Sequence, residues 1–346
     1  MEKKKVILKN VEMGSGSCVT IQSMTNTDTR NVEATVDQIL ELERAGCEIV
    51  RSSVYDAECV EALKRIIPSI HIPLVADIHF DHRLAIGAIE AGVAKVRINP
   101  GNIGSEAKVR ELAACAKANK VPIRIGVNGG SLEKEILREY GVTAKAMVMS
   151  AVRHARMLEK AAFDDIVISL KTSDVKTTVG AYRLANEMLP YPLHLGVTEA
   201  GSGEDALVKS AVGIGSLLLD GIGDTIRVSM TGGVVQEVYA AKKILKAVGI
   251  RDFGPNVISC PTCGRTRVEL PKIVERVKAA LPADGKPINV AVMGCAVNGP
   301  GEASEADIGI AFGKNNAAVF RAGKIAYTDK LPGVIDRFIE DCLNLV

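Results

Sequence analysis

The first 250 residues alternate short β-branched segments with longer amphipathic ones, and this alternation restricts the possible folds more than any other feature. Eight segments have the composition of buried strands: residues 19–24, 48–54, 73–79, 95–99, 122–128, 165–171, 192–198 and 225–230. Between these segments, apolar residues recur with helical spacing. The pattern predicts a (β/α)8 barrel of the TIM type, with a doubly wound open sheet as the alternative. The count of eight and the size of about 250 residues favour the barrel.

The pattern changes after Gly249, where residues 251–256 are typical of a linker. Beyond the linker we expect a strand leading into Cys260, further strands at residues 288–293, 306–312 and 317–328 (the last a hairpin), and helices at 270–281 and 331–344. The sequence therefore predicts a barrel domain over residues 1–250 and a small α+β domain over residues 251–346.

Composition excludes several classes of protein. Lys and Arg number 43 against 41 Asp and Glu, so a net charge of +2 favours neither nucleic acid nor an anionic membrane as partner. Trp is absent and aromatic residues make up 3%, which argues against base stacking. The basic N-terminal segment lacks the apolar run of a signal peptide, and no segment approaches the roughly 18 apolar residues of a membrane span. We expect a cytoplasmic protein with reduced thiols.

Cationic side chains occur on five of the predicted strands, and in a barrel the carboxyl ends of the strands carry function. The cations are Arg51, Arg97, Arg124, Lys171 and Arg227, accompanied by the polar residues Asn99, Asn128 and Ser229. Only Asp77 and Glu199 are nearby carboxylates. Five converging cations repel one another unless an anion lies among them. We therefore expect a phosphate or diphosphate ligand at the barrel mouth.

Other polar residues of the barrel give weaker signals. His79 shares a strand face with Asp77, whereas we expect His71, His82 and His154 to have no function. The segment GVNGGSLEKE at residues 126–135 has two interpretations. It is either a phosphate-binding turn at a helix N-terminus or a plain turn with Ser131 as the N-cap and Lys134 at N3.

Three of the eight cysteines form a ligand pattern in the second domain. Cys260 and Cys263 make a C-x2-C motif, and Cys295 follows 32 residues after Cys263. Structural zinc normally needs four Cys or His ligands, yet no histidine follows Cys260. Three thiolates can hold three irons of a 4Fe-4S cluster, and Glu302 is the nearest donor for the fourth. Because a carboxylate is replaced more easily than a thiolate, this set favours a catalytic cluster over an electron relay, with structural zinc as the alternative.

The remaining five cysteines do not fit a ligand pattern. Cys47, Cys115 and Cys342 lie within apolar periodic segments. We expect these three to be buried and chemically inert, and we extend this expectation to Cys18 and Cys59.

Several segments together resemble one enzyme family. They occur in order along nearly the whole chain: QSMTNTDTR, AGCEIVR, ADIHF, RINPGNIG, RIGVN, SLEKE, SDV, TEAG, GIGDTIRVS, CPTCGR and MGCAVNGPGEA. With them the chain resembles the 4-hydroxy-3-methylbut-2-enyl diphosphate synthases, in their shorter two-domain form. The resemblance implies reductive ring opening and dehydration of 2-C-methyl-D-erythritol 2,4-cyclodiphosphate in non-mevalonate isoprenoid biosynthesis. Flavodoxin or ferredoxin would supply the two electrons.

The resemblance also implies roles for individual residues. A 4Fe-4S cluster would be held by Cys260, Cys263, Cys295 and Glu302, and Glu199 would act as a proton donor. Substrate would be bound by Arg51, Arg97, Asn99, Arg124, Asn128, Lys171, Arg227 and Ser229. Members of the family are homodimers in which the cluster domain of one subunit caps the barrel of the other. The segments NGGS and SMTGG depart from the family pattern in loop detail only.

Two other classes of protein remain as alternatives. The first is a barrel enzyme without redox chemistry, such as a phosphate-ester lyase or a pterin-type transferase, with structural zinc in the tail. The second is a non-enzymatic zinc-ribbon binding module on a barrel scaffold. Metal content separates the first alternative from a cluster enzyme, and a nucleic-acid binding test addresses the second.

Overall fold

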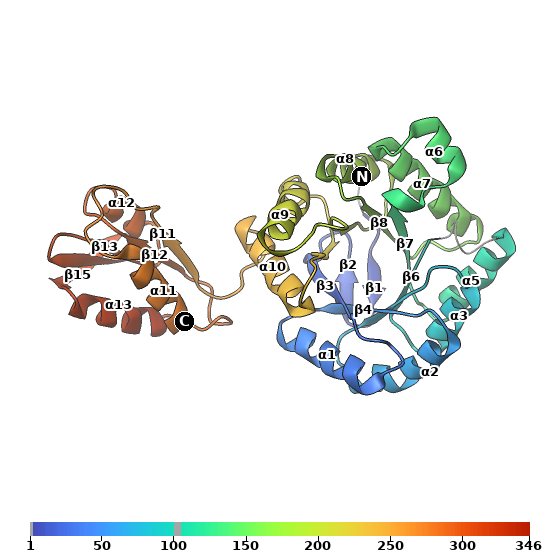
Figure 1. Ribbon diagram of the computed structural model, residues 1–346, viewed down its shortest axis with the longest axis horizontal. Coiled ribbons are helices and arrows are strands. Elements are labelled where there is room, and N and C mark those ends of the chain that lie inside the picture. The colour runs from blue at the N-terminus through green and yellow to red at the C-terminus, as the bar shows by residue number, and fades with distance from the viewer. Residues whose placement is uncertain (1–2, 100–104) are drawn as a thin grey trace. The chain divides into compact units, whose positions relative to one another are not determined.

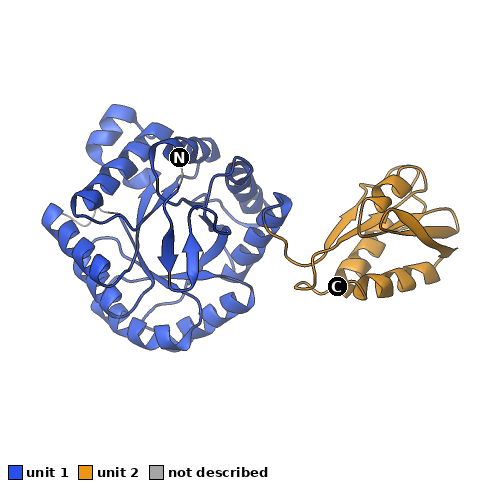
Figure 2. Ribbon diagram, turned by 180° about the vertical axis from the view of Figure 1, so that it is seen from behind, with its two compact units in different colours: residues 1–250 blue, residues 251–346 orange. Residues whose placement is uncertain are grey.

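The computed structural model describes residues 3–99 and 105–346, so the segment from Pro100 to Gly104 of the RINPGNIG motif lies outside the described residues. The chain divides into two compact units, residues 1–250 and residues 251–346 (Figures 1 and 2). Each unit has its own sheet and its own hydrophobic core.

Within the described residues, the first unit contains an eight-stranded parallel barrel whose neighbouring strands follow chain order. The strands are β3 (Thr20–Met24), β4 (Ile49–Ser53), β5 (Leu74–Asp77), β6 (Lys95–Ile98), β7 (Ile123–Asn128), β8 (Ile166–Lys171), β9 (His194–Leu195) and β10 (Thr225–Ile226). Strand β10 pairs with β3, and a parallel bridge between Ile168 and Leu193 joins β8 to the segment entering β9. The predicted (β/α)8 barrel is therefore confirmed, and the open-sheet alternative is wrong.

Helices surround the barrel (Figure 1). They are α1 (Val32–Arg44), α2 (Ala57–Ile66), α3 (His82–Glu90), α5 (Glu106–Ala118), α6 (Lys134–Tyr140), α7 (Ala144–Lys160), α8 (Val175–Met188), α9 (Gly203–Leu219) and α10 (Val234–Ala247). Several begin at a side chain that accepts a hydrogen bond from the first turn, such as Asn31 before α1 and Asp174 before α8. Over residues 3–99 and 105–346, no helix combines the length and apolar character needed to cross a bilayer.

A hairpin that the sequence pattern did not indicate precedes the barrel. Strands β1 (Val6–Leu8) and β2 (Val11–Met13) pair antiparallel. The hairpin packs Leu8 and Met13 against Ile49, Val75 and Val167, which lie near the starts of their barrel strands. The hairpin therefore covers the N-terminal end of the barrel. Three-residue strands carry too little alternation to be recognised in the sequence.

Two further predictions about the barrel need correction. Strands β9 and β10 are only two residues long, shorter than the segments 192–198 and 225–230 expected from the sequence. Just beyond them Gly196 lies close to the backbone of Arg227, since a Cβ on Gly196 would lie 2.7 Å from the Arg227 carbonyl oxygen. Ser131 is not an N-cap: it ends a 3-10 turn (Gly129–Ser131), its hydroxyl donates to the Asn128 carbonyl oxygen at 3.3 Å, and Glu133 precedes α6.

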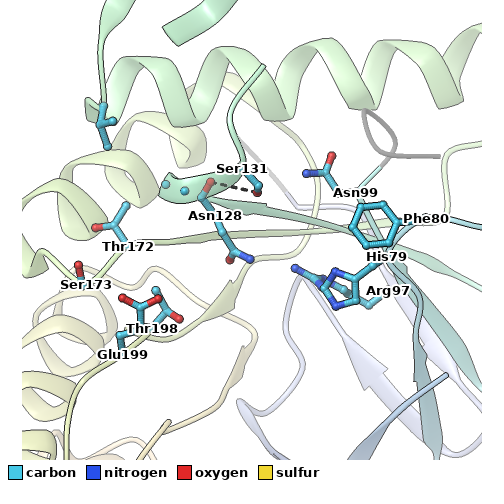
Figure 3. A pocket seen from close by; sticks show the side chains of 13 residues that line it. His79, Phe80, Arg97, Asn99, Asn128, Ser131, Thr172, Ser173, Thr198 and Glu199 are labelled. Atoms are coloured by element: carbon cyan, nitrogen blue, oxygen red, sulfur yellow. Dashed lines mark hydrogen bonds between the residues drawn. The ribbon is translucent and has the colours of Figure 1, made fainter. Parts of the chain in front are cut away.

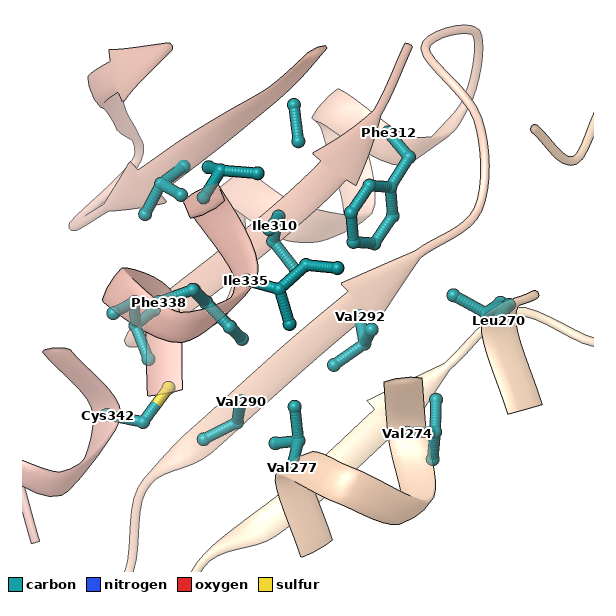
Figure 4. Packing of buried hydrophobic residues seen from close by; sticks show 14 of the residues in the cluster. Leu270, Val274, Val277, Val290, Val292, Ile310, Phe312, Ile335, Phe338 and Cys342 are labelled. Carbon is teal, nitrogen blue, oxygen red and sulfur yellow. The ribbon is translucent and has the colours of Figure 1, made fainter. Parts of the chain in front are cut away.

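The second unit is built on a five-stranded sheet in the order β11-β12-β13-β14-β15. Its strands are β11 (Asn256–Ser259), β12 (Asn289–Met293), β13 (Ile308–Phe312), β14 (Asn316–Arg321) and β15 (Lys324–Lys330), with the first three parallel. Helices α11 (Leu270–Ala280) and α13 (Gly333–Leu343) pack against one face (Figure 4). Val290, Val292 and Ile310 face them from the sheet.

The opposite face of this sheet carries α12 (Gly299–Ser304), a short helix that the sequence pattern does not predict. Ala291 and Met293 alternate with the valines of β12 and contact Ala303. Small residues permit this contact, since a Cβ on Gly299 would lie 3.0 Å from the Met293 Cβ. Pro300 in the first turn suits a helix start. Helix α12 and the sheet therefore pack together through Gly299 and Ala303, and Glu302 lies on the exposed side of the helix.

The cysteines outside the ligand pattern differ in burial. Cys47, Cys59 and Cys342 are buried as expected, and burial raises the pKa of Cys47 and of Cys342 to about 12. Cys115 is only half-buried, and Cys18 is exposed. The expectation of burial is therefore wrong for Cys18, which lies in the loop before β3.

Candidate active site

A polar cavity of about 210 Å³ opens inside the carboxyl end of the barrel. It is lined by Arg51, Asp77, His79, Arg97, Arg124, Asn128, Ser169, Lys171, Thr198, Arg227 and Ser229. An outer pocket of about 650 Å³ shares four of these residues and adds Asn99 and Glu199 (Figure 3). The structure thus places all eight residues expected to bind substrate, together with Glu199, on the walls of two cavities that share four residues.

Strand register explains why these side chains converge. Asp77 is aligned with Arg97 across β5 and β6, and Arg97 is aligned with Arg124 across β6 and β7. Asn128 is aligned with Lys171 at the ends of β7 and β8. Because aligned residues on neighbouring parallel strands point to the same face, the whole set points into the barrel.

Asp77 is the buried carboxylate among the cations. The Arg97 guanidinium donates to its Oδ1 at 2.9 Å, and Arg51 Nε lies 3.7 Å from Oδ2. His79 Nε2 is 3.6 Å from the same Oδ2. Although burial opposes ionisation, Arg51, His79 and Arg97 hold the pKa of Asp77 well below its ordinary value. Asp77 is therefore ionised, and it neutralises only part of the positive charge.

Glu237 is a second buried carboxylate that sequence analysis missed. It lies on α10, is 3% exposed, and accepts hydrogen bonds from Arg227 at 3.0 and 3.2 Å. The Ser23 hydroxyl also donates to it at 3.1 Å. A signal was present: Glu237 falls on the same helical stripe as Val234, Val238 and Ala241, where a carboxylate needs a buried partner.

Arg124 has no such partner. Its side chain is fully buried, and none of its three nitrogens makes a hydrogen bond within the described residues. Burial and the neighbouring Arg51 and Arg97 lower its pKa well below the ordinary value. A fully buried guanidinium without an anion is unfavourable, so this site is organised for a negatively charged ligand.

Two glycines make room for the cations. A Cβ on Gly126 would lie 2.3 Å from Arg97 Nε, and a Cβ on Gly196 would lie 2.6 Å from Lys171 Nζ. Gly126 lies on β7 beside Arg97, and Gly196 follows β9 beside Lys171. The glycines therefore allow Arg97 and Lys171 to extend across neighbouring strands into the cavity.

The rim of the outer pocket carries the remaining expected residues. Glu199 is exposed and adopts a left-handed backbone conformation with φ of +53°. It has no hydrogen bond or ion pair with any residue in the described ranges 3–99 and 105–346. In Figure 3, Thr198 and Glu199 lie on one side of the pocket, with His79 and Arg97 on the other. Glu199 is therefore available to a ligand and leaves the positive charge of the inner cavity unneutralised.

The second unit has a separate cavity of about 190 Å³ at the carboxyl ends of β11 and β12. Cys260, Cys263, Cys295 and Glu302 all line it. The Gly294 amide donates to Cys260 Sγ at 3.4 Å. The predicted ligand set therefore lies around one cavity, with Glu302 presented by α12 rather than by a loop.

Backbone amides favour thiolates in this cavity. The Arg265 amide lowers the pKa of Cys263, and the amides of Val297 and Asn298 lower the pKa of Cys295. Deprotonated sulfur is the form that ligates metals. The backbone amides therefore favour the thiolate forms of Cys263 and Cys295, which are the forms that bind soft metal ions.

The fold and the two cavities define a two-domain TIM-barrel enzyme with an anion site in the barrel and a thiolate site in the smaller domain. Residues 3–242 match the GcpE TIM-barrel domain, and residues 256–343 match the GcpE protein C-terminal domain. The chain belongs to the GcpE family.

Curated relatives match over nearly their whole length. A protein of Clostridium perfringens named 4-hydroxy-3-methylbut-2-en-1-yl diphosphate synthase (flavodoxin) is 54% identical and covers 98% of this chain, which spans 97% of that protein. A protein of the same name from Caldanaerobacter subterraneus is 52% identical, with coverage of 99% and 97%. The resemblance recognised from the sequence motifs is therefore confirmed.

Solved structures of other enzymes share the barrel. Dihydropteroate synthase from Stenotrophomonas maltophilia aligns with a TM-score of 0.53 at 13% identity, covering 72% of this chain and all of that one. Type I 3-dehydroquinate dehydratase from Clostridium difficile gives a TM-score of 0.54 at 15% identity, covering 73% of this chain and all of that one. At such low identity these similarities support the barrel fold alone.

Proposed function

We propose that this protein is a flavodoxin-dependent 4-hydroxy-3-methylbut-2-en-1-yl diphosphate synthase. It opens the ring of 2-C-methyl-D-erythritol 2,4-cyclodiphosphate and releases water to give the linear diphosphate. One observation carries the proposal: a single chain holds both a buried anion site with surplus positive charge and a cavity lined by three cysteines and a glutamate. The full-length similarity to relatives of that name supports it.

The cavity in the second unit fits a 4Fe-4S cluster in its donor chemistry. Cys260, Cys263 and Cys295 would supply three thiolates, and Glu302 would supply a carboxylate for the fourth iron. Among the described residues, no three His, Cys, Asp or Glu side chains come close enough to hold a single metal ion. The four donors line one cavity of about 190 Å³. Three thiolates and one carboxylate match a 4Fe-4S cluster with one replaceable ligand better than the four Cys or His ligands of structural zinc. When bound, the cluster supplies single electrons to the substrate.

The barrel residues bind and orient the diphosphate. Arg124 and Lys171 provide buried positive charges without a carboxylate partner among the described residues, and Arg97 is held in place by Asp77. Further ligands are Arg51, Asn99, Asn128, Arg227 and Ser229. Loss of the substrate hydroxyl as water requires a proton. We assign its delivery to the carboxylic acid form of Glu199, whose side chain lines the outer pocket without a competing partner within the described residues.

We further propose that the protein acts as a homodimer in which the cluster domain of one subunit caps the barrel of the other. The described cavities support this, since the barrel cavity is lined by no cysteine and the cluster cavity by none of the barrel cations. Substrate binding and electron supply therefore need to be brought together. We propose flavodoxin as the electron donor, with ferredoxin as the alternative, and a cytoplasmic location.

Metal and sulfide analysis of the anaerobically purified protein tests this function. We expect about four irons and four acid-labile sulfides per chain and a brown, oxygen-sensitive protein. One zinc per chain with neither iron nor sulfide would contradict the proposal. That result would favour the alternative, a non-redox phosphate-ester enzyme with a structural zinc tail.

A further inference from the structure

Lys171 differs from the other cations of the cavity in its hydrogen-bond partner. Its side chain is buried at the end of β8, and no carboxylate of the described residues lies within ion-pair distance. Its Nζ is instead 3.2 Å from Nε2 of His194. An imidazole therefore occupies the position that a carboxylate takes beside Arg97 and Arg227.

The His194 ring is fully buried on β9. The sequence pattern placed Glu199 after this strand but gave no role to His194. An ammonium group has only hydrogens to donate, so Nε2 accepts and the ring proton lies on Nδ1. Nδ1 has no hydrogen-bond partner within the described residues. The ring is neutral, because burial and the charge of Lys171 hold the pKa of His194 well below its ordinary value.

The backbone fixes this pair from behind. The Tyr182 hydroxyl donates to the His194 carbonyl oxygen at 2.5 Å and accepts from the Leu170 amide at 3.1 Å. Gly196, two residues beyond His194, leaves the space that Lys171 Nζ occupies. His194 and Gly196 together therefore determine where the end of the Lys171 side chain lies.

The electrostatic surroundings oppose a charge on Lys171. The charged groups around the pair are Arg51 on β4, Lys95 and Arg97 on β6, Arg124 on β7, Arg227 after β10, Asp77 on β5 and Glu237 on α10. Both carboxylates are already bound to arginines. Burial, followed by Arg124 and Arg227, lowers the pKa of Lys171 well below its ordinary value.

We propose that His194 is a positioning residue, which accepts a hydrogen bond from Lys171 and thereby keeps its ammonium group both protonated and directed into the cavity for diphosphate binding. The inference rests on the proposed function for the identity of the ligand. A hydrogen bond to the charged form stabilises that form, so removing the acceptor lowers the pKa of Lys171 further. Diphosphate affinity then falls at a lower pH than in the wild type.

Two substitutions at His194 separate this role from simple packing. His194→Gln keeps an acceptor near the position of Nε2, whereas His194→Met fills similar space without one. The matched control is His82→Met, which replaces a buried ring on α3 whose partner, Glu111, lies outside the cavity. Thermal unfolding of all four proteins shows which variants are folded.

The measurement is the affinity of the holoenzyme for inorganic diphosphate by calorimetry from pH 6 to pH 9, without reductant. We expect His194→Met to bind about tenfold more weakly at neutral pH and to lose affinity at a lower pH than the wild type. His194→Gln and His82→Met should follow the wild-type curve. The ionisation of diphosphate changes over this range but affects all four proteins equally. The ratio of a variant's affinity to the wild-type affinity at each pH therefore reports on the protein alone.

An unchanged pH profile in His194→Met would overturn the inference, as would failure of the wild type to bind diphosphate. If His194→Met does not fold, the test rests on His194→Gln, which retains an acceptor. Diphosphate binding by His194→Gln that is about tenfold weaker than that of the wild type would then overturn the inference. Repeating the titration with the cyclic diphosphate separates the two proposals. Binding of inorganic but not cyclic diphosphate would contradict the proposed substrate while leaving the role of His194 supported.

Discussion

Arg97 and Arg124 lie side by side in register on β6 and β7, yet only Arg97 has a carboxylate partner, Asp77, at 2.9 Å. Arg124 is fully buried and unpaired within the described residues. Arg97 is therefore held in place by an ion pair, whereas Arg124 keeps all its hydrogen-bond donors available for a ligand. An unpaired buried cation lowers the stability of the empty protein and favours binding of an anion.

We predict that replacing Arg124 by Met raises the free energy of unfolding and abolishes tight substrate binding. Removing a buried unpaired charge should stabilise the empty protein by about 1–3 kcal/mol, while losing a charged contact should weaken diphosphate binding about a hundredfold. Urea unfolding and calorimetry measure the two effects. Arg97→Met is the matched control and should be destabilising, because it removes a partner of Asp77. Destabilisation by Arg124→Met would contradict this explanation.

The glycines beside the cations give a second prediction. Gly126→Ala and Gly196→Ala should each raise KM for the cyclic diphosphate by about tenfold or more, because the added Cβ displaces Arg97 or Lys171 from the cavity. Gly233→Ala is a suitable control, since its Cβ would meet nothing closer than 3.8 Å. Steady-state kinetics and a crystal structure of either variant provide the check. Wild-type KM in both alanine variants would show that the close approach has no functional role.

The pH dependence of stability should report on Asp77. Its folded-state pKa is depressed, so the unfolded chain binds its proton more readily, and stability is present above the unfolded value of about 3.9. That stability is lost as the pH falls from about 4 through the folded pKa. We expect Asp77→Asn to be less stable at neutral pH and to lose less on acidification. Urea unfolding between pH 3 and pH 7 tests this, and parallel curves for the two proteins would disagree with it.

Much of the barrel could be predicted because its signal is repeated. Strands β3 to β8 each fall within the segments expected from β-branched composition, and the cations on them point inward as period-two alternation requires. Alternation also places His194, Gly196 and Thr198 on one face. A lone histidine in an apolar strand, however, does not reveal that Lys171 lies across from it on β8.

The missed features depend on tertiary contacts. The role of Glu237 could not be predicted, because its partner Arg227 is brought to it only by the packing of α10 against the barrel. The β1–β2 hairpin is stabilised by the barrel end that it covers. Helix α12 forms in a segment of low helix propensity because Gly299 and Ala303 fit closely against the sheet. Sequence patterns identify the donors Cys260 and Cys263 but cannot show which element presents Glu302.

The ligand set of the second unit gives a fourth prediction. Glu302→Ala should retain most of its iron and sulfide but lose turnover by at least a hundredfold, because in the proposed site the three cysteines would hold the cluster and Glu302 would bind only the fourth iron. Cys295→Ser, in contrast, should lose iron in addition to turnover. Iron analysis and electron paramagnetic resonance follow both. Full activity in Glu302→Ala would exclude the ligand role, and the exposed Glu305→Ala variant serves as a control.

The most direct measurement of the proposed function is electron stoichiometry during turnover of the holoenzyme. The anaerobic protein is mixed with cyclic diphosphate and a limiting amount of reduced flavodoxin, and products are quantified by mass spectrometry. We expect one linear hydroxymethylbutenyl diphosphate for every two electrons consumed. Consumption of the cyclic diphosphate without electron uptake, or electron uptake without the linear product, would contradict the proposed reaction.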